Sequence, residues 1–372
     1  VLWHAALPSD AFAQVVAGRL PGHLWQTLAL TGSVTALAVV LGVPAAWLVS
    51  AYAFPGRRAF EWLLLLPLAM PAFIAAIAYV DAFRSLIPFY VWVRVTFGVD
   101  AFLYVQQAAP WVFAVTVLAA TLFPYVFLAC RAAFAREAAG ALEAARTLGA
   151  GNLRAFFGVA LPMARPAVAA GASLVAMETL NDYGVVTHFG LSPLTPGIFR
   201  AWNEGHLGAA MRLALILMAV AAIALLLERW QRGRRRFAAD PADAPLKRRR
   251  LGPSGIALAW LFCGVPLLLG FLLPAARLVR WAVLSGTQQA FDGAALAAAA
   301  GNSFRLAALA TLCITAAAAL VAGARRAFPG RFLSAAERVT LLGYSFPGAL
   351  VAVGIGALVA ALAGAGFSAL AL

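Results

Sequence analysis

The feature that most limits how this chain can fold is a series of apolar runs, each long enough to cross a bilayer. A transmembrane helix needs about 20 consecutive apolar residues, and a soluble core does not need such runs in series. The sequence therefore predicts an all-α, polytopic transmembrane helical bundle. The expected spans are Leu24–Tyr52, Phe60–Asp81, Trp111–Cys130, Pro166–Val186, Leu207–Leu227, Gly255–Pro274, Asn302–Val321 and Leu341–Ala363.

Charged residues are scarce, and their placement narrows the class of protein. They make up 11% of the chain, against about 25% in soluble domains. The net charge of +14 could suit nucleic acid, but basic residues gather in loops at alternate ends of the spans, as the positive-inside rule requires. We therefore expect no nucleic-acid partner. Cys130, Cys263 and Cys313 are scattered in apolar segments and indicate neither a disulfide nor a metal site.

Two segments near the N-terminal end differ from simple spans. Phe60–Asp81 contains Pro67 and Pro71, and prolines at membrane depth need neighbouring helices to satisfy the freed carbonyls, so this span should be kinked and packed inward. Phe83–Pro110 is rich in aromatic residues with isolated charges, which favours an interfacial helix on the outer face. Val1–His23 carries Pro, Gly and Asp and is expected outside the membrane.

An internal repeat divides the chain. The FPGR turn at Phe54–Arg57 recurs at Phe328–Arg331, and a proline-bearing helix follows each copy, with Pro71 and Pro347. Even numbers of crossings separate the two turns, so the repeat is parallel and not inverted. The predicted organisation is a first half at 1–237, a basic cytoplasmic linker at 238–252 and the start of a second half at 253–372.

Comparing the halves indicates what this sequence does not contain. Gly255–Pro274 is a full span at a place where the first half has only Val1–His23. We therefore expect a fragment that lacks the first span and the C-terminal part of a fused protein. The basic residues from Arg229 to Arg250 flank the linker and are interpreted either as a topology anchor or as a site for membrane lipid headgroups.

One polar loop, Leu142–Pro166, interrupts the apolar chain. Its first part consists of strong helix formers, with Leu142, Ala145 and Leu148 on one narrow stripe. Gly149 is suited to a left-handed helix C-cap, and a second amphipathic segment, Leu153–Val159, follows. The pattern predicts a helix, a glycine break and a second helix.

The spacing within this loop resembles a known family. Its pattern is Glu-Ala-Ala, three residues, Gly, nine residues, Val, one residue and Leu-Pro, which is similar to the EAA loop of binding-protein-dependent ABC importer permeases except that Val159 replaces Ile. In that family the loop docks in a groove of the ATP-hydrolysing subunit. The resemblance implies that the coupling residues are Glu143, Ala144, Ala145, Gly149, Val159, Leu161 and Pro162. Read without the family, the loop is an ordinary helical hairpin.

The resemblance also implies a fold, a location and partners. The expected fold is that of a type I ABC importer permease in the bacterial inner membrane, with an ATPase dimer and a periplasmic binding protein as partners. This chain would be no enzyme and would bind no cofactor. It has no phosphate-binding Gly-rich loop ending in Lys-Ser/Thr, so ATP and Mg²⁺ would act in the partner ATPase.

A second candidate site contains paired acids beside a predicted span. Glu178 and Asp182 are four residues apart, so on a helix both carboxylates would share one face and could steer a hard cation. They could equally bond backbone at a helix end. We assign Glu178, Asp182 and Tyr183 to the expected translocation path and no residue to a metal site, because two acids without a third ligand do not form one.

The stretch Glu178–Gly190 (ETLNDYGVVTHFG) together with Thr195–Trp202 (TPGIFRAW) resembles ferric-iron permeases of this superfamily. Ferric iron is therefore the expected substrate, while thiamine, polyamine and sulfate permeases share parts of the pattern and remain alternatives. His188 and His206 are candidates for contact with a binding protein, or simply solvated residues.

Two other classes of function are weighed against an importer. An ion-gradient-driven secondary transporter predicts inverted repeats and a charged midplane site, which a parallel repeat does not favour. A non-transporting membrane scaffold has no need of proline-broken spans or paired acids.

Overall fold

The computed structural model describes residues 18–84, 86–136, 139–232, 248–288 and 292–327, and isolated residues between 330 and 359. The chain forms two compact units, one made of residues 1–276 and 347–372 and the other of residues 277–346. The second FPGR turn, Pro347 and most of the expected span Leu341–Ala363 lie outside the described residues.

The described residues contain six helical segments that are long and apolar enough to cross a membrane. A bent pair, Arg57–Ala69 with Ala72–Val80, would make a seventh span if it is counted as one. The six segments are Leu20–Ala51, Val99–Ala135, Asn152–Asn181, Leu207–Glu228, Pro253–Leu284 and Gly293–Ala324. The prediction of an all-α, polytopic membrane protein is confirmed.

The elements follow one another with short connections. The first unit begins with α3 (Leu20–Ala51), β1 (Tyr52–Ala53), α4 (Arg57–Leu63), the 3₁₀ turn η1 (Leu66–Ala69), α5 (Ala72–Arg84), α6 (Ile87–Phe97) and α7 (Val99–Arg136). It continues with α8 (Ala139–Thr147), α9 (Asn152–Ala155), the π-helical turn η2 (Phe156–Ala160), α10 (Leu161–Asn181), α11 (Gly184–His188), α12 (Leu194–Asn203) and α13 (Leu207–Arg232). The last elements are β2 (Arg249–Arg250), α14 (Pro253–Leu267), the π-helical turn η3 (Leu268–Leu272), α15 (Leu273–Gln288) and α16 (Gly293–Ala327). The second unit contains α15 from Arg277 onward and all of α16.

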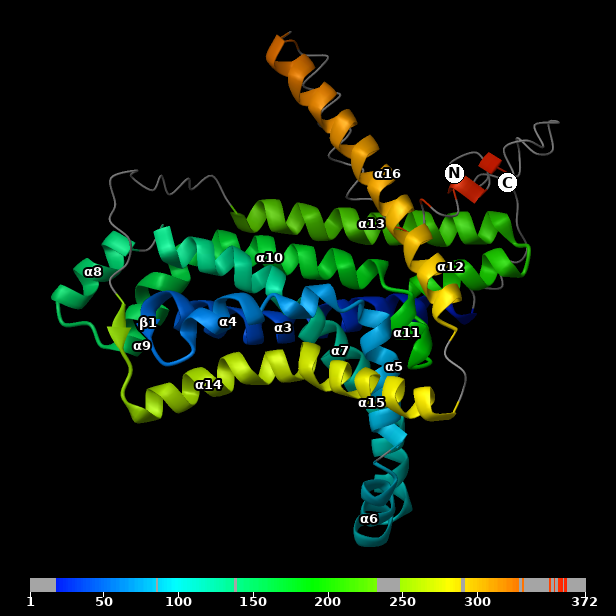
Figure 1. Ribbon diagram of the computed structural model, residues 1–372, viewed down its shortest axis with the longest axis horizontal. Helices are drawn as coiled ribbons and strands as arrows, with labels where there is room; N and C mark the ends of the chain where they lie inside the picture. Colours follow the sequence, from blue (N-terminus) through cyan, green and yellow to red (C-terminus); the bar gives the residue numbers. More distant parts are fainter. Residues whose placement is uncertain are drawn as a thin grey trace. The chain divides into compact units, whose positions relative to one another are not determined.

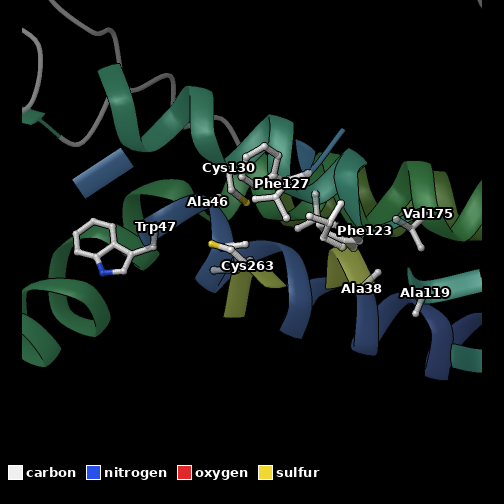
Figure 2. Close-up of a cluster of buried hydrophobic side chains, with 14 of the residues drawn as sticks. Ala38, Ala46, Trp47, Ala119, Phe123, Phe127, Cys130, Val175 and Cys263 are labelled. Carbon is white, nitrogen blue, oxygen red and sulfur yellow. The ribbon is translucent and has the colours of Figure 1, made fainter. Parts of the chain in front are cut away.

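The core of the first unit lies where α3, α7, α10 and α14 meet. Figure 2 shows Phe123 and Phe127 of α7 among small side chains of α3, with Val175 of α10 and Cys263 of α14 beside them. Alternating large and small side chains allow close helix packing, which in a membrane depends on van der Waals contact and not on the hydrophobic effect. Helix α3 begins at Leu20, before the expected start of the span at Leu24, and His23 is buried within it; the extramembrane position of Val1–His23 stays a prediction.

The predicted kink in Phe60–Asp81 is a full break. The chain turns by 85° between the segment that ends at Ala69 and the helix that starts at Ala72. Pro71 has no backbone N–H to continue the hydrogen bonding of the preceding turn, and Pro67 is buried next to Gly270 of η3. In Figure 1, α5 therefore runs across the direction of α10 and α13 and not alongside them.

The expectation of one interfacial helix over Phe83–Pro110 needs correction. The segment contains the end of α5, all of α6 and the first turns of α7, which continues past Pro110 to Arg136. Gly98 forms the turn between α6 and α7. Figure 1 shows α6 lying away from the parallel helices of the unit. Its placement at a membrane interface stays a prediction.

The helix predicted to open the second half packs on the first half. The hydroxyl of Tyr79 in α5 donates a 2.7 Å hydrogen bond to the carbonyl of Leu269 in η3. Gly270 lies so close to α7 that a Cβ there would be 2.0 Å from the carbonyl oxygen of Ala120. Because α14 and η3 belong to the same compact unit as α3, the proposed division at 252/253 stays a statement about the repeat and not about packing.

Candidate functional site

The polar loop has the helix, break and helix that the sequence predicts. Helix α8 ends at Thr147, and Gly149 has a φ of +84°, the left-handed region that glycine adopts most readily. The amide of Gly149 donates to the carbonyl of Arg146 at 3.0 Å, and that of Ala150 donates to Ala145 at 3.0 Å. These two bonds form a Schellman cap, so Gly149 ends α8 as expected.

The apolar stripe of α8 is divided between two environments. Leu142 is fully buried against the bundle, Ala145 is half-buried, and Leu148 is 89% exposed. Glu143 is half-buried and Ala144 exposed. The helix therefore attaches to the bundle at Leu142 and presents Leu148 outward.

The second part of the loop joins the next span without a break. The chain runs from α9 through the π turn η2 into α10, so the span begins before Pro166, contrary to the expectation that it begins there. Val159, Leu161 and Pro162 are partly buried, and Leu161 packs on the core. These three residues are therefore less exposed than Leu148, and their part in coupling stays a prediction.

Several arginines surround the base of the loop. Burial raises the pKa of the Tyr52 phenol, and the nearby guanidinium groups of Arg146 and Arg249 oppose that rise. Burial also lowers the pKa of Arg146, and repulsion from Arg249 adds to this effect. We call the side of the first unit that carries Tyr52, Arg146 and Arg249 the basic end; the positive-inside rule predicts that it faces the cytoplasm.

A charged cluster holds the FPGR turn at the same end. One carboxylate oxygen of Glu61 accepts from Arg57 at 2.7 Å and from Arg131 at 3.3 Å. Arg57 also donates to the backbone carbonyl of Val49 at 3.3 Å. The cluster joins α4 to the end of α7, next to the loop.

The paired acids lie at the end of the first unit opposite the basic end. The prediction that Glu178 and Asp182 share one helix face is wrong. Helix α10 ends at Asn181, and Asp182 is its extended cap residue. The Asp182 carboxylate accepts hydrogen bonds from the amides of Val185 and Val186 at 3.0 and 3.1 Å. Asp182 therefore makes the backbone bonds at a helix end that were the alternative interpretation of the pair.

The environment of Asp182 changes its acidity. Burial raises its pKa to about 6; the two backbone bonds oppose this rise, and the charge of Glu178 adds to it. Among the described residues, no three His, Cys, Asp or Glu side chains are grouped to hold a metal ion. The translocation role of Glu178, Asp182 and Tyr183 stays a prediction.

Tyr183 lines a pocket at this opposite end. Its ring lies 4.6 Å from that of Phe199 between centroids, and 42% of the residue is exposed. The pocket has a volume of about 320 Å³ and is lined by Tyr183, Thr187, Pro196, Arg200, Asn203 and Glu204. It therefore offers hydroxyl, amide, cationic and anionic groups in one place. His188 and His206, the candidates for binding-protein contact, are both exposed.

Sequence reasoning missed the residues that hold this end together. The His23 ring nitrogen Nδ1 hydrogen-bonds the carbonyl of Ser192, and Thr27 Oγ1 accepts from the amide of Leu194 at 2.9 Å. Gln26 accepts from the amide of Ser192 at 2.8 Å. Polar side chains near the start of an apolar run were the available signal, but their partners are more than 160 residues away.

Known proteins are similar to this chain over a region that contains both candidate sites. A model of the binding-protein-dependent transport system inner membrane component matches residues 38–236, which include the loop and the paired acids. The molybdenum transport system permease protein ModB of Escherichia coli (strain K12) is 31% identical over 222 residues, 55% of this chain and 92% of that protein.

Two further relatives differ in what their names say they carry. The Fe(3+)-transport system permease protein FbpB 2 of Haemophilus influenzae is 23% identical over 341 residues, 91% of this chain and 63% of that protein. The sulfate transport system permease protein CysT of Salmonella typhimurium is 31% identical over 147 residues, 40% of this chain and 50% of that protein.

Proposed function

This chain belongs to the family of binding-protein-dependent transport system inner membrane components, and from that premise we propose that it imports ferric iron with energy from a separate ATPase. It is a multi-pass inner-membrane protein and a transport subunit. ATP and Mg²⁺ would act in a partner ATPase dimer, and a periplasmic binding protein would deliver the substrate. Membership of this family argues against an ion-gradient-driven transporter and against a non-transporting scaffold.

The exposed part of α8 supports contact with the ATPase. Leu148 stands 89% exposed on a helix whose other end is attached through the buried Leu142. Leu153 and Phe157 of the same loop are also exposed, and large apolar side chains that stand out from a loop are suited to insert into pockets of a partner. Movement of the ATPase would then reach the spans through the continuous helix from Asn152 to Asn181.

The iron assignment is supported by the extent of one alignment. The similarity to the ferric-iron permease extends over 91% of this chain, past the family match that ends at residue 236. It includes Glu178 and Asp182, whose oxygens are ligands that a hard cation prefers. One Asp182 oxygen accepts two backbone bonds, from the amides of Val185 and Val186.

A tetrahedral oxyanion is the second candidate, because of the pocket around Arg200. Guanidinium, hydroxyl and amide groups are donors that recognise oxyanions, and Arg200, Thr187 and Asn203 supply them within one pocket of about 320 Å³. Glu204 in the same pocket opposes an anion. The relatives named for molybdenum and sulfate each reach 31% identity over shorter alignments.

Uptake of labelled ions separates these substrates. Cells that express the chain with its ATPase and binding protein would be supplied with radiolabelled ferric citrate or molybdate. Ferric-iron uptake that falls in the double variant Glu178→Gln/Asp182→Asn, but not in Arg200→Gln, supports the iron proposal. Molybdate uptake that is lost in Arg200→Gln would replace it with the oxyanion.

Truncation of Leu148 tests the ATPase contact without reference to substrate. Leu148→Ala should weaken retention of the ATPase in a pull-down by about ten-fold or more, in the range of an interface hot spot. Thr147→Ala is the matched control, since Thr147 is exposed on the same turn. Equal retention by both variants would remove Leu148 from the interface.

A further inference from the structure

An apolar groove lies at the basic end of the first unit, between the end of α3, the turn α9–η2 and helix α14. Its volume is about 280 Å³, close to the lower limit of roughly 300 Å³ for pockets that hold small molecules. Its walls are formed by Trp47, Leu48, Leu153, Phe156, Leu258 and Phe262. The exposed walls are almost entirely apolar, so water is a poor occupant.

A positive charge lies beside this groove. Asn152 and Tyr52 are among its lining residues, and Nη1 of Arg249 lies 3.5 Å from Oδ1 of Asn152. Arg249 is exposed and is held in place because β2 pairs with β1, with Arg249 opposite Tyr52. Arg146 is close enough to Tyr52 and Arg249 to influence both of them electrostatically. The guanidinium group of Arg249 therefore lies beside a residue that lines the apolar groove.

This combination selects one class of ligand. An apolar groove alone would accept any acyl chain, and an arginine alone would accept any phosphate. We propose that the groove binds an anionic phospholipid, with an acyl chain between α3 and α14 and the headgroup phosphate on Arg249. Basic pockets between membrane helices at the cytoplasmic side are suited to such headgroups. The proposal does not depend on which substrate the protein carries.

The location gives the lipid a structural consequence. Leu153 and Phe156 belong to the candidate coupling loop, whereas Leu258 and Phe262 belong to α14. An acyl chain that lies between these two segments contacts both of them and fills the space that separates them. Bound lipid should therefore reduce local unfolding of the backbone from Asn152 to Phe156. This stretch is the start of the continuous helical segment that includes α10.

Native mass spectrometry of the purified protein tests the headgroup. Added phosphatidylglycerol should bind more tightly than phosphatidylethanolamine. Arg249→Gln should lower the affinity for phosphatidylglycerol about five-fold, the effect of one basic residue at an anionic surface. Arg250→Gln is the matched control, because successive side chains of a strand point to opposite sides. Equal loss in both variants, or no loss in either, would overturn the assignment.

Inorganic phosphate distinguishes a lipid from a free anion. Phosphate at millimolar concentration should not displace phosphatidylglycerol, because it leaves the apolar groove unfilled. Displacement would mean that the site recognises phosphate alone, and the lipid proposal would be wrong.

A pair of tryptophan variants tests the groove itself. Leu258 and Leu261 of α14 are similarly exposed, at 53% and 55%, but only Leu258 lines the groove. Leu258→Trp should reduce phosphatidylglycerol binding, while Leu261→Trp should not. In hydrogen exchange, phosphatidylglycerol should protect amides 152–156 in the wild type and in Leu261→Trp, but not in Leu258→Trp. Protection that is the same in all three proteins would contradict the proposed position of the lipid.

Discussion

Gly171 of α10 lies directly against Val126 of α7, so close that a Cβ at position 171 would be 2.6 Å from the Cα of Val126. On the other side of Val126, a Cβ at Gly42 of α3 would be 2.9 Å from the Val126 Cβ. Three helices therefore meet around one valine, and two of them approach it through glycine. This contact sets the spacing of the helices that connect the loop to the opposite end of the unit.

Gly171→Leu should destabilise the protein, because the backbone of α7 cannot move away without disturbing α3. We expect the free energy of unfolding to fall by about 1 to 3 kcal/mol, the usual range for overpacking, and the thermal midpoint in detergent to fall with it. Gly32→Leu on α3 is the control, since a Cβ there meets nothing within 4 Å. Equal midpoints for the two variants would show that the helices are less closely held than this contact implies.

Gly149→Ala should disturb the C-cap of α8, because φ at this position is +84°. A left-handed conformation costs a residue with a Cβ about 1 to 2 kcal/mol. We expect ATP hydrolysis to become uncoupled from transport while membrane insertion is unchanged, measured as ATP used per substrate moved. Gly151→Ala is the control, because Gly151 has a φ of −66° and open space around its Cα. Normal coupling in Gly149→Ala would argue against the loop as a coupling element.

Asp182→Ala should remove the cap of α11 at a cost of about 1 kcal/mol. Asp182→Asn keeps an oxygen that can accept the bonds from Val185 and Val186, so it should retain that stability. Thermal unfolding of both variants measures the difference. If the alanine and asparagine variants unfold at the same temperature, the two backbone bonds contribute nothing measurable.

The same carboxyl predicts a pH dependence. Its pKa is raised from 3.8 to about 6, so the folded state holds the proton more tightly than the unfolded state does. The contribution of Asp182 to stability is therefore greatest below about pH 3.8 and falls as the pH rises to about 6. Relative to Asp182→Asn, the wild type should lose stability across this interval. A constant difference between the two proteins from pH 4 to pH 7 would contradict the raised pKa.

Cysteine labelling checks the orientation. Thr147→Cys should react with an impermeant maleimide only from the cytoplasmic side, and Glu204→Cys only from the outside, since both residues are exposed at opposite ends of the first unit. The variants should be made in Cys313→Ser, because Cys313 is the exposed cysteine while Cys130 and Cys263 are buried. External labelling at position 147 would reverse the orientation and place the loop beyond reach of an ATPase.

Local features of this protein could be predicted from the sequence. The apolar runs of about 20 residues required helices, because no other element satisfies its backbone groups in lipid without forming a closed barrel. The cap at Gly149 followed from the tolerance of glycine for positive φ and from the helix formers before it. The sequence thus predicted the left-handed backbone conformation of Gly149.

Features that depend on distant contacts were decided only by the tertiary structure. The stripe of α8 did not show that Leu142 would be buried and Leu148 exposed, because burial depends on which neighbours pack against the helix. The spacing of Glu178 and Asp182 predicted a shared face only while the helix continued, and α10 ends at Asn181 because the hydroxyl of Thr195 bonds the carbonyl of Leu180 and Asp182 turns to cap α11. The position of Arg249 beside the groove likewise depends on the pairing of β2 with β1 across nearly 200 residues of chain.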